Sequence, residues 1–490
     1  MRVYFGHLDL GIGGAERLVV NLALGLHQDG QDVHLFTTHH DPTHCFEETK
    51  PGEVLGKKVT VYGEWLPRQV IGRFTALCSI IRMIWLCIIL IGHYWTGHFD
   101  VLVLDGVSAP LPLLWLFGVP TLFYCHYPDK LLCTKRDALV KRVYRFFIDA
   151  LEDMSICCAH AVVCNSQFTR NKVKASFPLL AALTKGEQQS GLSVLYPPVE
   201  DVDDETFSAS IPAPDYLGRD GDEKETCPFF LSLNRYERKK DIGLALRALV
   251  ALRRATPETK EERTRRTSGA TTTTTTTSGR TPHGHAVVLV IAGGHDPTVL
   301  ENVDYKKELE EIAREAGVTA QVVFRTSICD SERSALLRHA AALLYTPSNE
   351  HFGIVPLEAM LVETPVIAVR SGGPLETVVD HGSHPTRSTG FLVSPTADAF
   401  AAAMRDILND PTEARRMGMR GRERVRDEFL LAACTRKLLA GVRESMERAS
   451  VVSTYFCQGV LWTVLLAAMM IPLTATASTY TVSGVLNALK

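Results

Sequence analysis

A chain of 490 residues is long enough for two or three domains that each bury a full core. Its 52 Lys and Arg nearly balance 55 Asp and Glu, and the net charge of -3 excludes a protein that binds nucleic acid through an overall positive field. The 12 cysteines include no CxxC pair, so we expect reduced cysteines in a protein that faces the cytosol.

The N-terminal residues predict a strand, RVYFGH, that leads through a glycine pair into a helix. Gly13 and Gly14 lie at the junction. A glycine pair there is either a tight turn or a place where the backbone approaches a phosphate. The pattern is not the dinucleotide-binding fingerprint, because Glu16 stands where a third small residue is needed.

The next notable stretch, residues 76–92, is strongly apolar and is interrupted by one charge, Arg82. Its uncharged part is short for a membrane span. The stretch therefore predicts either a core helix or a helix that lies in the membrane surface. We favour membrane contact, because so much apolar surface on a soluble domain has to be covered.

Apolar runs alternate with helical patterns through residues 1–199, which predicts a Rossmann-like domain with a parallel sheet. Polar residues follow three of its strands: Asp105, His126 and the pair Asn165-Ser166. Ligands of such sheets bind at the carboxyl ends of the strands, so these residues are candidates for ligand contact. A lone histidine at a strand end is, however, more often structural.

Residues 200–228 are acidic and marked by Pro and Gly, and they predict a linker. A second alternation of strands and helices covers residues 229–430, with a polar segment at 256–285 that includes seven consecutive threonines. That segment cannot bury a core and predicts a disordered insertion. The fold class is thus α/β, with two doubly wound, Rossmann-like parallel-sheet domains that face a cleft.

The stretch NEHFGIVPLEAM holds two carboxylates, Glu350 and Glu358. Pro356 is typical of a first helical turn, so we expect Glu350 on the preceding loop and Glu358 in the first turn. The carboxylates could simply complement the helix dipole. The loop at Phe352-Gly353 also exposes backbone N–H groups beside a carboxylate, an arrangement that can hold a polyhydroxylated ligand.

The C-terminal part predicts a basic connector at 431–448 and an apolar tail at 449–490. Residues 451–473 carry no charge, and as a helix they would extend roughly 35 Å, enough to cross a bilayer. We predict a membrane anchor, with a buried helix as the alternative. The basic residues before it favour a main body on the cytosolic side.

The motif around Glu350 and Glu358 resembles the donor-sugar motif of the family 4 retaining glycosyltransferases, which have the GT-B fold. The resemblance implies that Glu350 approaches the transferred sugar and that Glu358 holds the ribose hydroxyls of the nucleotide. It also implies that Phe352 and Gly353 lie beside the donor.

Other segments resemble the same family. SLNRYERKKDIGLAL implies that Arg235 and Lys240 neutralise the leaving diphosphate, although Asp241 stands where the family usually has Gly. GIGGAER resembles the family's glycine loop, which implies that Gly13 and Gly14 approach the diphosphate.

His126 matches the acceptor-side histidine of many members, and Asp105 is a further candidate on that side. The resemblance thus implies Glu350, His126 and Lys240 as the catalytic residues.

Together these segments look like the eukaryotic mannosyltransferases that assemble dolichol-linked oligosaccharides. That implies GDP-mannose as donor and Man1GlcNAc2-diphosphodolichol as acceptor, an α-1,3 and then an α-1,6 mannose, and the cytosolic face of the endoplasmic reticulum membrane. Other early glycosylation enzymes are possible partners. No cofactor and no metal are expected, because Asp201–Asp204 imitates a metal-binding motif without a strand before it.

Two alternatives stay open. One is another GT-B transferase, of the phosphatidylinositol or UDP-sugar type. The other is a catalytically silent scaffold that binds a sugar nucleotide.

Overall fold

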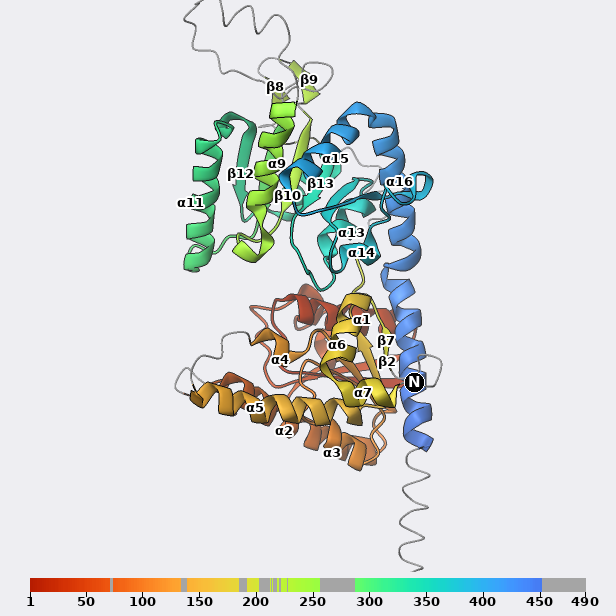
Figure 1. Cartoon of the computed structure of the whole chain (residues 1–490). Helices are drawn as coiled ribbons and strands as arrows, with labels where there is room; N and C mark the ends of the chain where they lie inside the picture. The colour runs from red at the N-terminus through yellow and green to blue at the C-terminus, as the bar shows by residue number, and fades with distance from the viewer. Residues whose placement is uncertain are drawn as a thin grey trace, which may run out of the picture. The chain divides into compact units, whose positions relative to one another are not determined.

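The computed structural model describes residues 1–70, 74–133, 139–184, 192–201, 228–255 and 287–451, with a few residues between 212 and 226. The chain forms two compact units (Figure 1). Unit 1 comprises residues 1–163, 173–193 and the described chain from Lys437, and unit 2 comprises residues 164–172 and 194–436. The units interleave along the chain, because the last described helix returns to the N-terminal unit.

Three predicted segments lie mostly outside the described residues. They are the insertion at 256–285, the linker at 200–228 and the apolar segment at 451–473. The disordered insertion and the membrane anchor therefore stay predictions. Within the linker, two short antiparallel strands are described that the sequence did not predict, β8 (Gly218–Arg219) and β9 (Asp222–Thr226).

Unit 1 is built on a seven-stranded sheet in the order β3-β2-β1-β4-β5-β6-β7. The pairings among β1 to β5 are parallel. The chain starts in the middle of the sheet, runs to one edge and then returns to fill the other side, which is the doubly wound topology. The strands are β1 (Arg2–His7), β2 (Asp32–Thr37), β3 (Val59–Val61), β4 (Val101–Asp105), β5 (Thr121–Cys125), β6 (Ala161–Cys164) and β7 (Leu192–Val194).

Helices follow most of these strands, as parallel crossovers require. Every residue of β4 and β5 is buried, which explains why VLVLD and TLFYC lack the alternation of a half-exposed strand. The helices are α1 (Gly14–Gln28), α2 (Thr75–Trp95), α3 (Leu111–Leu116), α4 (Asp129–Leu132), α5 (Leu139–Ser155), α6 (Gln167–Ser176) and α7 (Pro178–Leu183).

Helix α2 contains the apolar stretch 76–92. One face of this helix is buried in the core, and the opposite face is exposed. Its buried residues recur at helical spacing and include Arg82, which pairs with the carboxylate of Asp9. Leu77, Ile81 and Ile88 are exposed on the same helix. By length and composition α2 is the one helix among the described residues that could cross a membrane, and 44% of its most apolar window is buried inside the protein. The buried face confirms a core helix, and membrane contact of the exposed face stays a prediction.

Unit 2 has a six-stranded parallel sheet in the order β12-β11-β10-β13-β14-β15. The strands are β10 (Phe229–Leu233), β11 (Val288–Gly293), β12 (Val322–Thr326), β13 (Ala342–Tyr345), β14 (Val366–Val369) and β15 (Gly390–Val393). The main helices are α9 (Ile242–Ala255), α11 (Leu300–Glu315), α12 (Asp330–His339), α13 (Ile354–Leu361), α14 (Pro374–Thr377), α15 (Ala397–Asn409) and α16 (Pro411–Glu428).

Two hydrophobic clusters cover the two faces of this sheet. Phe230 of β10 belongs to the cluster formed with α9, α11 and α15, and the next residue, Leu231, belongs to the cluster formed with α12, α13 and α16. This is the alternation of side chains that a strand buried on both faces requires. The rigid sheet positions the loops after β10 and β13, which carry the expected donor residues.

Candidate active site

The loop that carries Glu350 connects β13 to α13 and is held by the loop after β14. The backbone N–H of Gly373 donates to the carbonyl oxygen of Glu350 at 2.8 Å. A Cβ on Gly372 would lie 2.3 Å from the Glu350 carbonyl oxygen, and one on Gly373 would lie 1.9 Å from the Phe352 carbonyl oxygen. Only glycine lets the two backbones come this close.

We expect Gly373→Ala to lower the free energy of unfolding by about 1–3 kcal/mol, because backbone rather than a flexible side chain would have to move. The matched control is Gly382→Ala, where the nearest atom to an added Cβ lies at an ordinary 3.4 Å. Denaturant unfolding of both variants measures the difference. Equal stability of the two would show that the loops do not need this contact.

Lys240 and Glu350 meet at the centre of this site. Lys240 Nζ lies 2.5 Å from Glu350 Oε2, and the side chains are only 13% and 25% exposed. Thr346, the residue after β13, donates its hydroxyl to the Lys240 carbonyl oxygen at 2.7 Å. The structure therefore brings a predicted diphosphate-binding cation and a predicted sugar-binding carboxylate together across 110 residues of sequence.

Asp241, the departure from the family pattern, adopts a left-handed conformation with φ 43° and ψ 46°. Glycine adopts this conformation without strain, and aspartate tolerates it better than most residues. The backbone geometry thus explains the glycine expected here, and the substitution keeps the turn that presents Lys240.

Arg235 follows β10, and its side chain is 64% exposed with Nη1 3.1 Å from Glu237 Oε1. Gly293 and Gly294, at the end of β11, approach the backbone of Asn234 and the side chain of Arg235. Arg235 is thus an accessible cation on a turn held by close backbone packing.

Glu358 is the fifth residue of α13, which places it just beyond the first helical turn and not within it as predicted. It forms an ion pair with Arg333 of α12. Arg333 was missed because nothing in SERSALLRH distinguishes it from a solvent-facing arginine. Any ligand hydroxyl that reaches Glu358 therefore meets a carboxylate that already has a cationic partner.

Phe352 and Gly353 shape the loop in different ways. The Phe352 ring is 5% exposed and stacks on Tyr196 with ring centroids 5.5 Å apart, so this residue can offer a ligand only its backbone. Gly353 has φ 80°, and a Cβ there would lie 2.9 Å from Tyr345 Oη. The positive φ of Gly353 and the lack of room for a Cβ both require glycine at this position.

Asn165 and Ser166 belong to unit 2 and lie directly before helix α6, whose residues up to Lys172 also belong to unit 2. The fully buried Ser166 accepts from the N–H of Thr169 at 3.0 Å, which is a helix N-cap. It also donates to the carbonyl oxygen of His351 at 2.5 Å. These contacts give Ser166 a structural role at the start of α6, and its ligand contact stays a prediction.

Gly13 is the residue before the first turn of α1, and Gly14 is the first residue of that helix. An added Cβ on Gly13 would lie 2.2 Å from Glu16 Oε2, and one on Gly14 would have no atom within 4 Å. The carboxylate of Glu16 therefore lies over the positive end of α1, where an anion is favoured. Gly14 leaves open space beside it.

A buried cluster of His7, Asp105 and His126 lies at the carboxyl ends of three neighbouring strands of unit 1. His7 Nδ1 lies 2.7 Å from Asp105 Oδ1, and His126 Nε2 lies 2.9 Å from Asp105 Oδ2. The Asp105 side chain is 3% exposed, whereas that of His126 is 26% exposed. Of the three, His126 is the one that reaches solvent.

The close contacts in this cluster shift the pKa values of Asp105 and His7 in opposite directions. Burial alone would raise the pKa of Asp105, but the charge of His7 and the hydrogen bonds from both histidines hold that pKa far below its usual range. Burial would lower the pKa of His7, and the adjacent Asp105 reverses this, so the pKa of His7 is raised. The sequence interpretation missed His7, although it ends β1, which lies beside the strand that ends in Asp105.

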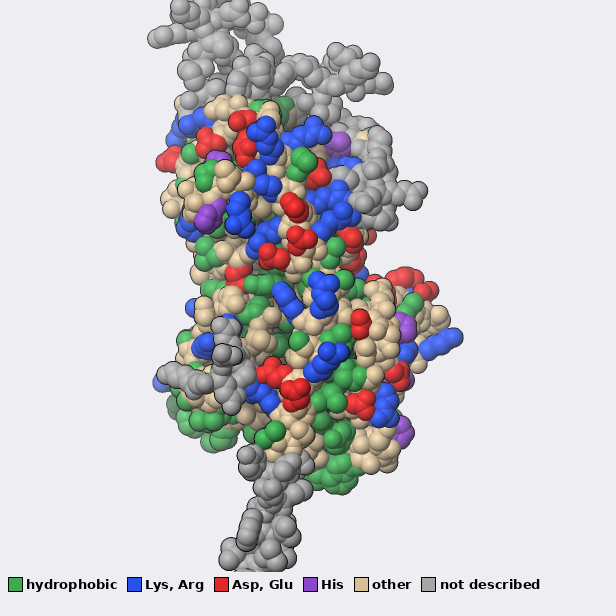
Figure 2. All heavy atoms as spheres, turned by 90° about the vertical axis from the view of Figure 1, so that its right-hand side faces the viewer, with side chains coloured by type: hydrophobic (Ala, Val, Ile, Leu, Met, Phe, Trp, Pro, Cys, Tyr) green, Lys and Arg blue, Asp and Glu red, His purple; other side chains and the backbone are tan. Residues whose placement is uncertain are grey.

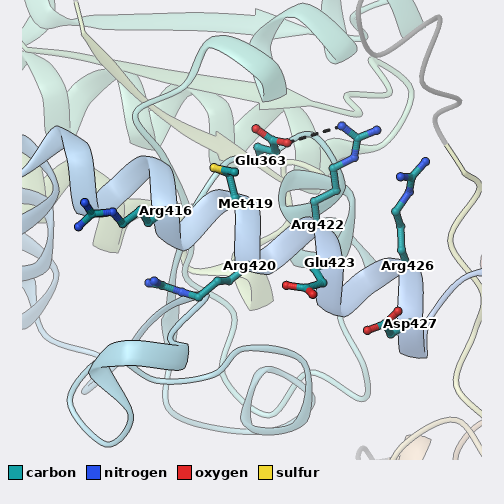
Figure 3. A pocket seen from close by; sticks show the side chains of 8 residues that line it. All are labelled: Glu363, Arg416, Met419, Arg420, Arg422, Glu423, Arg426 and Asp427. Atoms are coloured by element: carbon teal, nitrogen blue, oxygen red, sulfur yellow. Dashed lines mark ion pairs between the residues drawn. The ribbon is translucent and has the colours of Figure 1, made fainter.

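A separate hollow of about 590 Å³ lies along α16 (Figure 3). Each of its four arginines has a carboxylate partner, as Arg422 has Glu363 at 3.6 Å. None of the residues expected at the donor site lines it. Among the residues that the structure describes, no three His, Cys, Asp or Glu side chains form a group that could hold a metal ion.

Two family models match the chain. Residues 12–182 match the model described as Glycosyltransferase Family 4, and residues 219–424 match the model described as Glycosyl transferases group 1.

Several curated relatives carry the name Alpha-1,3/1,6-mannosyltransferase ALG2. The relative from Rhizomucor pusillus is 39% identical over 460 residues, which cover 90% of this chain and 91% of the relative. The relative from Homo sapiens is 39% identical over 441 residues, which cover 89% and 94%. The relative from Dictyostelium discoideum is 40% identical over 434 residues, which cover 86% and 93%.

Solved structures with a similar fold include sucrose-phosphate synthase from Thermosynechococcus elongatus. Its TM-score is 0.58 at 20% identity, with 90% of this chain and 98% of that chain covered. The catalytic domain of starch synthase IV from Arabidopsis thaliana has a TM-score of 0.59 at 15% identity, with 91% and 99% covered. At such low identity the likeness shows the fold alone, which is GT-B with two Rossmann-like domains.

Proposed function

The chain belongs to glycosyltransferase family 4, and from this we propose that it transfers mannose from GDP-mannose to a dolichol-linked oligosaccharide. The acceptors are Man1GlcNAc2-diphosphodolichol and then its Man2 product, extended by an α-1,3 and an α-1,6 mannose. The observation that carries the proposal is the identity of about 39% to mannosyltransferases of this name over about 90% of the chain.

The contact between Lys240 and Glu350 supports a mechanism for the transfer. In the free protein each side chain neutralises the other, because an unpaired charge at this burial is costly. When the donor binds, its diphosphate attracts Lys240 and the exposed Arg235. Glu350 is then available to position the mannose and to stabilise the positive charge that develops at its C1.

The reaction breaks the bond between mannose C1 and the diphosphate oxygen and forms a bond between C1 and an acceptor hydroxyl oxygen. The hydroxyl proton passes to the departing GDP, whose charge Lys240 and Arg235 offset. Attack from the face that GDP leaves retains the configuration at C1. Glu358 binds the ribose hydroxyls of the nucleotide. His126, whose ring is oriented by Asp105, contacts the acceptor.

The decisive test is transfer by membranes that contain the full-length protein. GDP-mannose and Man1GlcNAc2-diphospholipid are supplied, and the product glycans are weighed. We expect a gain of two hexoses that is absent with Glu350→Ala. Binding of GDP-mannose without any gain would favour a silent scaffold, and competition by UDP but not GDP would favour a UDP-sugar enzyme.

Exposed apolar side chains support attachment of unit 1 to the cytosolic face of the endoplasmic reticulum membrane. Phe146 and Phe147 of α5 are 67% and 66% exposed and line a hollow of about 650 Å³ on that helix. Ile81 and Ile88 of α2 are also exposed. Hydrophobic side chains gather at the lower end of unit 1 in Figure 2. Such apolar surfaces mark membrane or protein contacts.

The orientation is tested with an epitope inserted in the threonine tract at 271–277 of the full-length protein. We expect an antibody to reach it when only the plasma membrane is permeabilised. Access that requires permeabilised endoplasmic reticulum would place the catalytic body in the lumen and contradict the proposed location.

A further inference from the structure

A cavity of about 380 Å³ lies in unit 1 next to the His7–Asp105–His126 cluster. Leu8 and Gly106, which line it, directly follow His7 and Asp105 in the chain. The volume is within the range of about 300–1,000 Å³ that is usual for small-molecule sites. The cavity therefore opens at the edge of the sheet where the acceptor-side residues lie.

The walls of this cavity are mainly apolar and come mostly from two helices and two strand-end loops, with Asp129 at the start of a third helix, α4. Leu8, Ile80, Val107, Ile148 and Leu151 supply the larger apolar side chains, and each of them is half-buried. Ile80 belongs to α2, and Ile148 and Leu151 belong to α5.

The polar groups of the lining are largely occupied by the protein itself. The Glu152 carboxylate accepts from the backbone N–H groups of Asp129 and Lys130 at 2.8 and 3.0 Å. Asp129 Oδ2 lies 2.9 Å from Arg145 Nη1. The Ser108 hydroxyl lies 2.8 Å from that of Ser155. What remains for a ligand is chiefly apolar surface.

The charge of the cavity argues against a phosphate. The described residues that line it include Asp129 and Glu152 and no Lys or Arg. Burial raises the pKa of Glu152 to about 7, so this carboxyl is partly neutral near physiological pH. An uncharged ligand with few hydrogen-bonding groups fits best.

The two helices that line the cavity also carry exposed apolar side chains on their outer faces. Leu77 and Ile81 of α2 are 40% and 47% exposed. Phe146 and Phe147 of α5 are 67% and 66% exposed. The helices are joined where the backbone N–H of Leu77 donates to Tyr144 Oη at 3.0 Å. A chain leaving the cavity between them would meet these exposed apolar side chains.

We propose that this cavity binds the first isoprene units of the polyprenyl chain of the lipid-linked acceptor. The proposal rests on the function proposed above. An isoprenoid has no hydrogen-bonding groups and gains free energy from apolar walls in proportion to the area buried. Binding the chain here would hold the attached diphosphate and sugars near His126, whereas a sugar ring would need polar partners that these walls do not offer.

The test compares two tryptophan substitutions in the full-length protein. Ile80→Trp fills the cavity, and Leu300→Trp is the control at the start of α11 in unit 2, where the leucine is 77% exposed. The longer acceptor is Man1GlcNAc2-diphosphate carried on a chain of four isoprene units, and the shorter acceptor is the same diphosphate esterified with a single methyl group, which has no isoprene unit to place in the cavity. We expect Ile80→Trp to raise KM for the longer acceptor about tenfold, as expected when one or two buried methylenes are expelled, and to leave KM for GDP-mannose unchanged.

We expect Ile80→Trp to change KM for the shorter acceptor less than KM for the longer one. This difference would identify the isoprenoid as the ligand of the cavity. Equal effects of Ile80→Trp on both acceptors, or no effect on either, would overturn the proposal. If Ile80→Trp does not fold, a diazirine on the isoprene unit next to the diphosphate tests the wild-type protein directly. Label within 75–80 or 148–152 supports the site, and label elsewhere overturns it. Failure of the wild-type protein to use either acceptor would instead reject the proposed function.

Discussion

Glu350→Gln is expected to lower kcat about 100- to 1,000-fold while KM for GDP-mannose changes only a fewfold, because the substitution removes a charge that acts mainly as positive charge develops on the sugar. Glutamine keeps the size and one acceptor oxygen of the side chain. Steady-state kinetics with varied GDP-mannose separates the two parameters.

The matched control is Glu423→Gln, an exposed carboxylate that lines the hollow on α16. It should leave kcat and KM unchanged. A Glu350→Gln enzyme with near-normal kcat would remove Glu350 from the reaction. Loss of activity in Glu423→Gln would indicate that the hollow in Figure 3 contributes to the reaction.

Glu350→Gln also leaves Lys240 without its partner at a position that is 13% exposed. We expect a loss of stability of roughly 1–3 kcal/mol, since an unpaired, partly buried ammonium is costly and some solvent still reaches it. Excess GDP should restore part of this loss, because its diphosphate supplies a new partner and ligand binding stabilises the folded state.

The sequence was sufficient for the two Rossmann-like parallel-sheet domains because its signals are local. Continuous apolar runs such as VLVLD and VLVIAGG predict buried parallel strands, and both sheets have the doubly wound order. Glu350 and Lys240 were recognised through family motifs. Their contact at 2.5 Å depends on the pairing of β10 with β13, which no local pattern specifies.

The residues that were missed act through long-range contacts. Arg333 looks like any helix-surface arginine until α12 and α13 place it against Glu358. Gly372 and Gly373 were visible as a pair, but their role depends on a loop more than 20 residues earlier in the chain. His7 could have been found by asking which polar residues end neighbouring central strands, since β1 lies beside β4.

Asp105→Asn is expected to lower kcat about 100-fold, within the range of effects that positioned acid–base groups have. The substituted amide has a single acceptor oxygen, and its NH2 group would present donors toward a histidine that Asp105 now orients by accepting. Because the Asp105 carboxylate is buried with both oxygens engaged, it acts through His126 and not on the acceptor itself. KM for GDP-mannose should therefore stay unchanged.

A pH series distinguishes this positioning role from a general structural defect. The raised pKa of His7 means that its contribution to stability is present below about pH 6.5 and is lost as the pH rises through the folded-state value. The lowered pKa of Asp105 gives a contribution that is present above about pH 4 and is lost only in strong acid. Wild-type protein should consequently lose stability through this pair as the pH rises above about 6.5, and Asp105→Asn should lack that loss. An Asp105→Asn protein with the wild-type pH dependence and normal kcat would show that the cluster neither titrates nor positions His126.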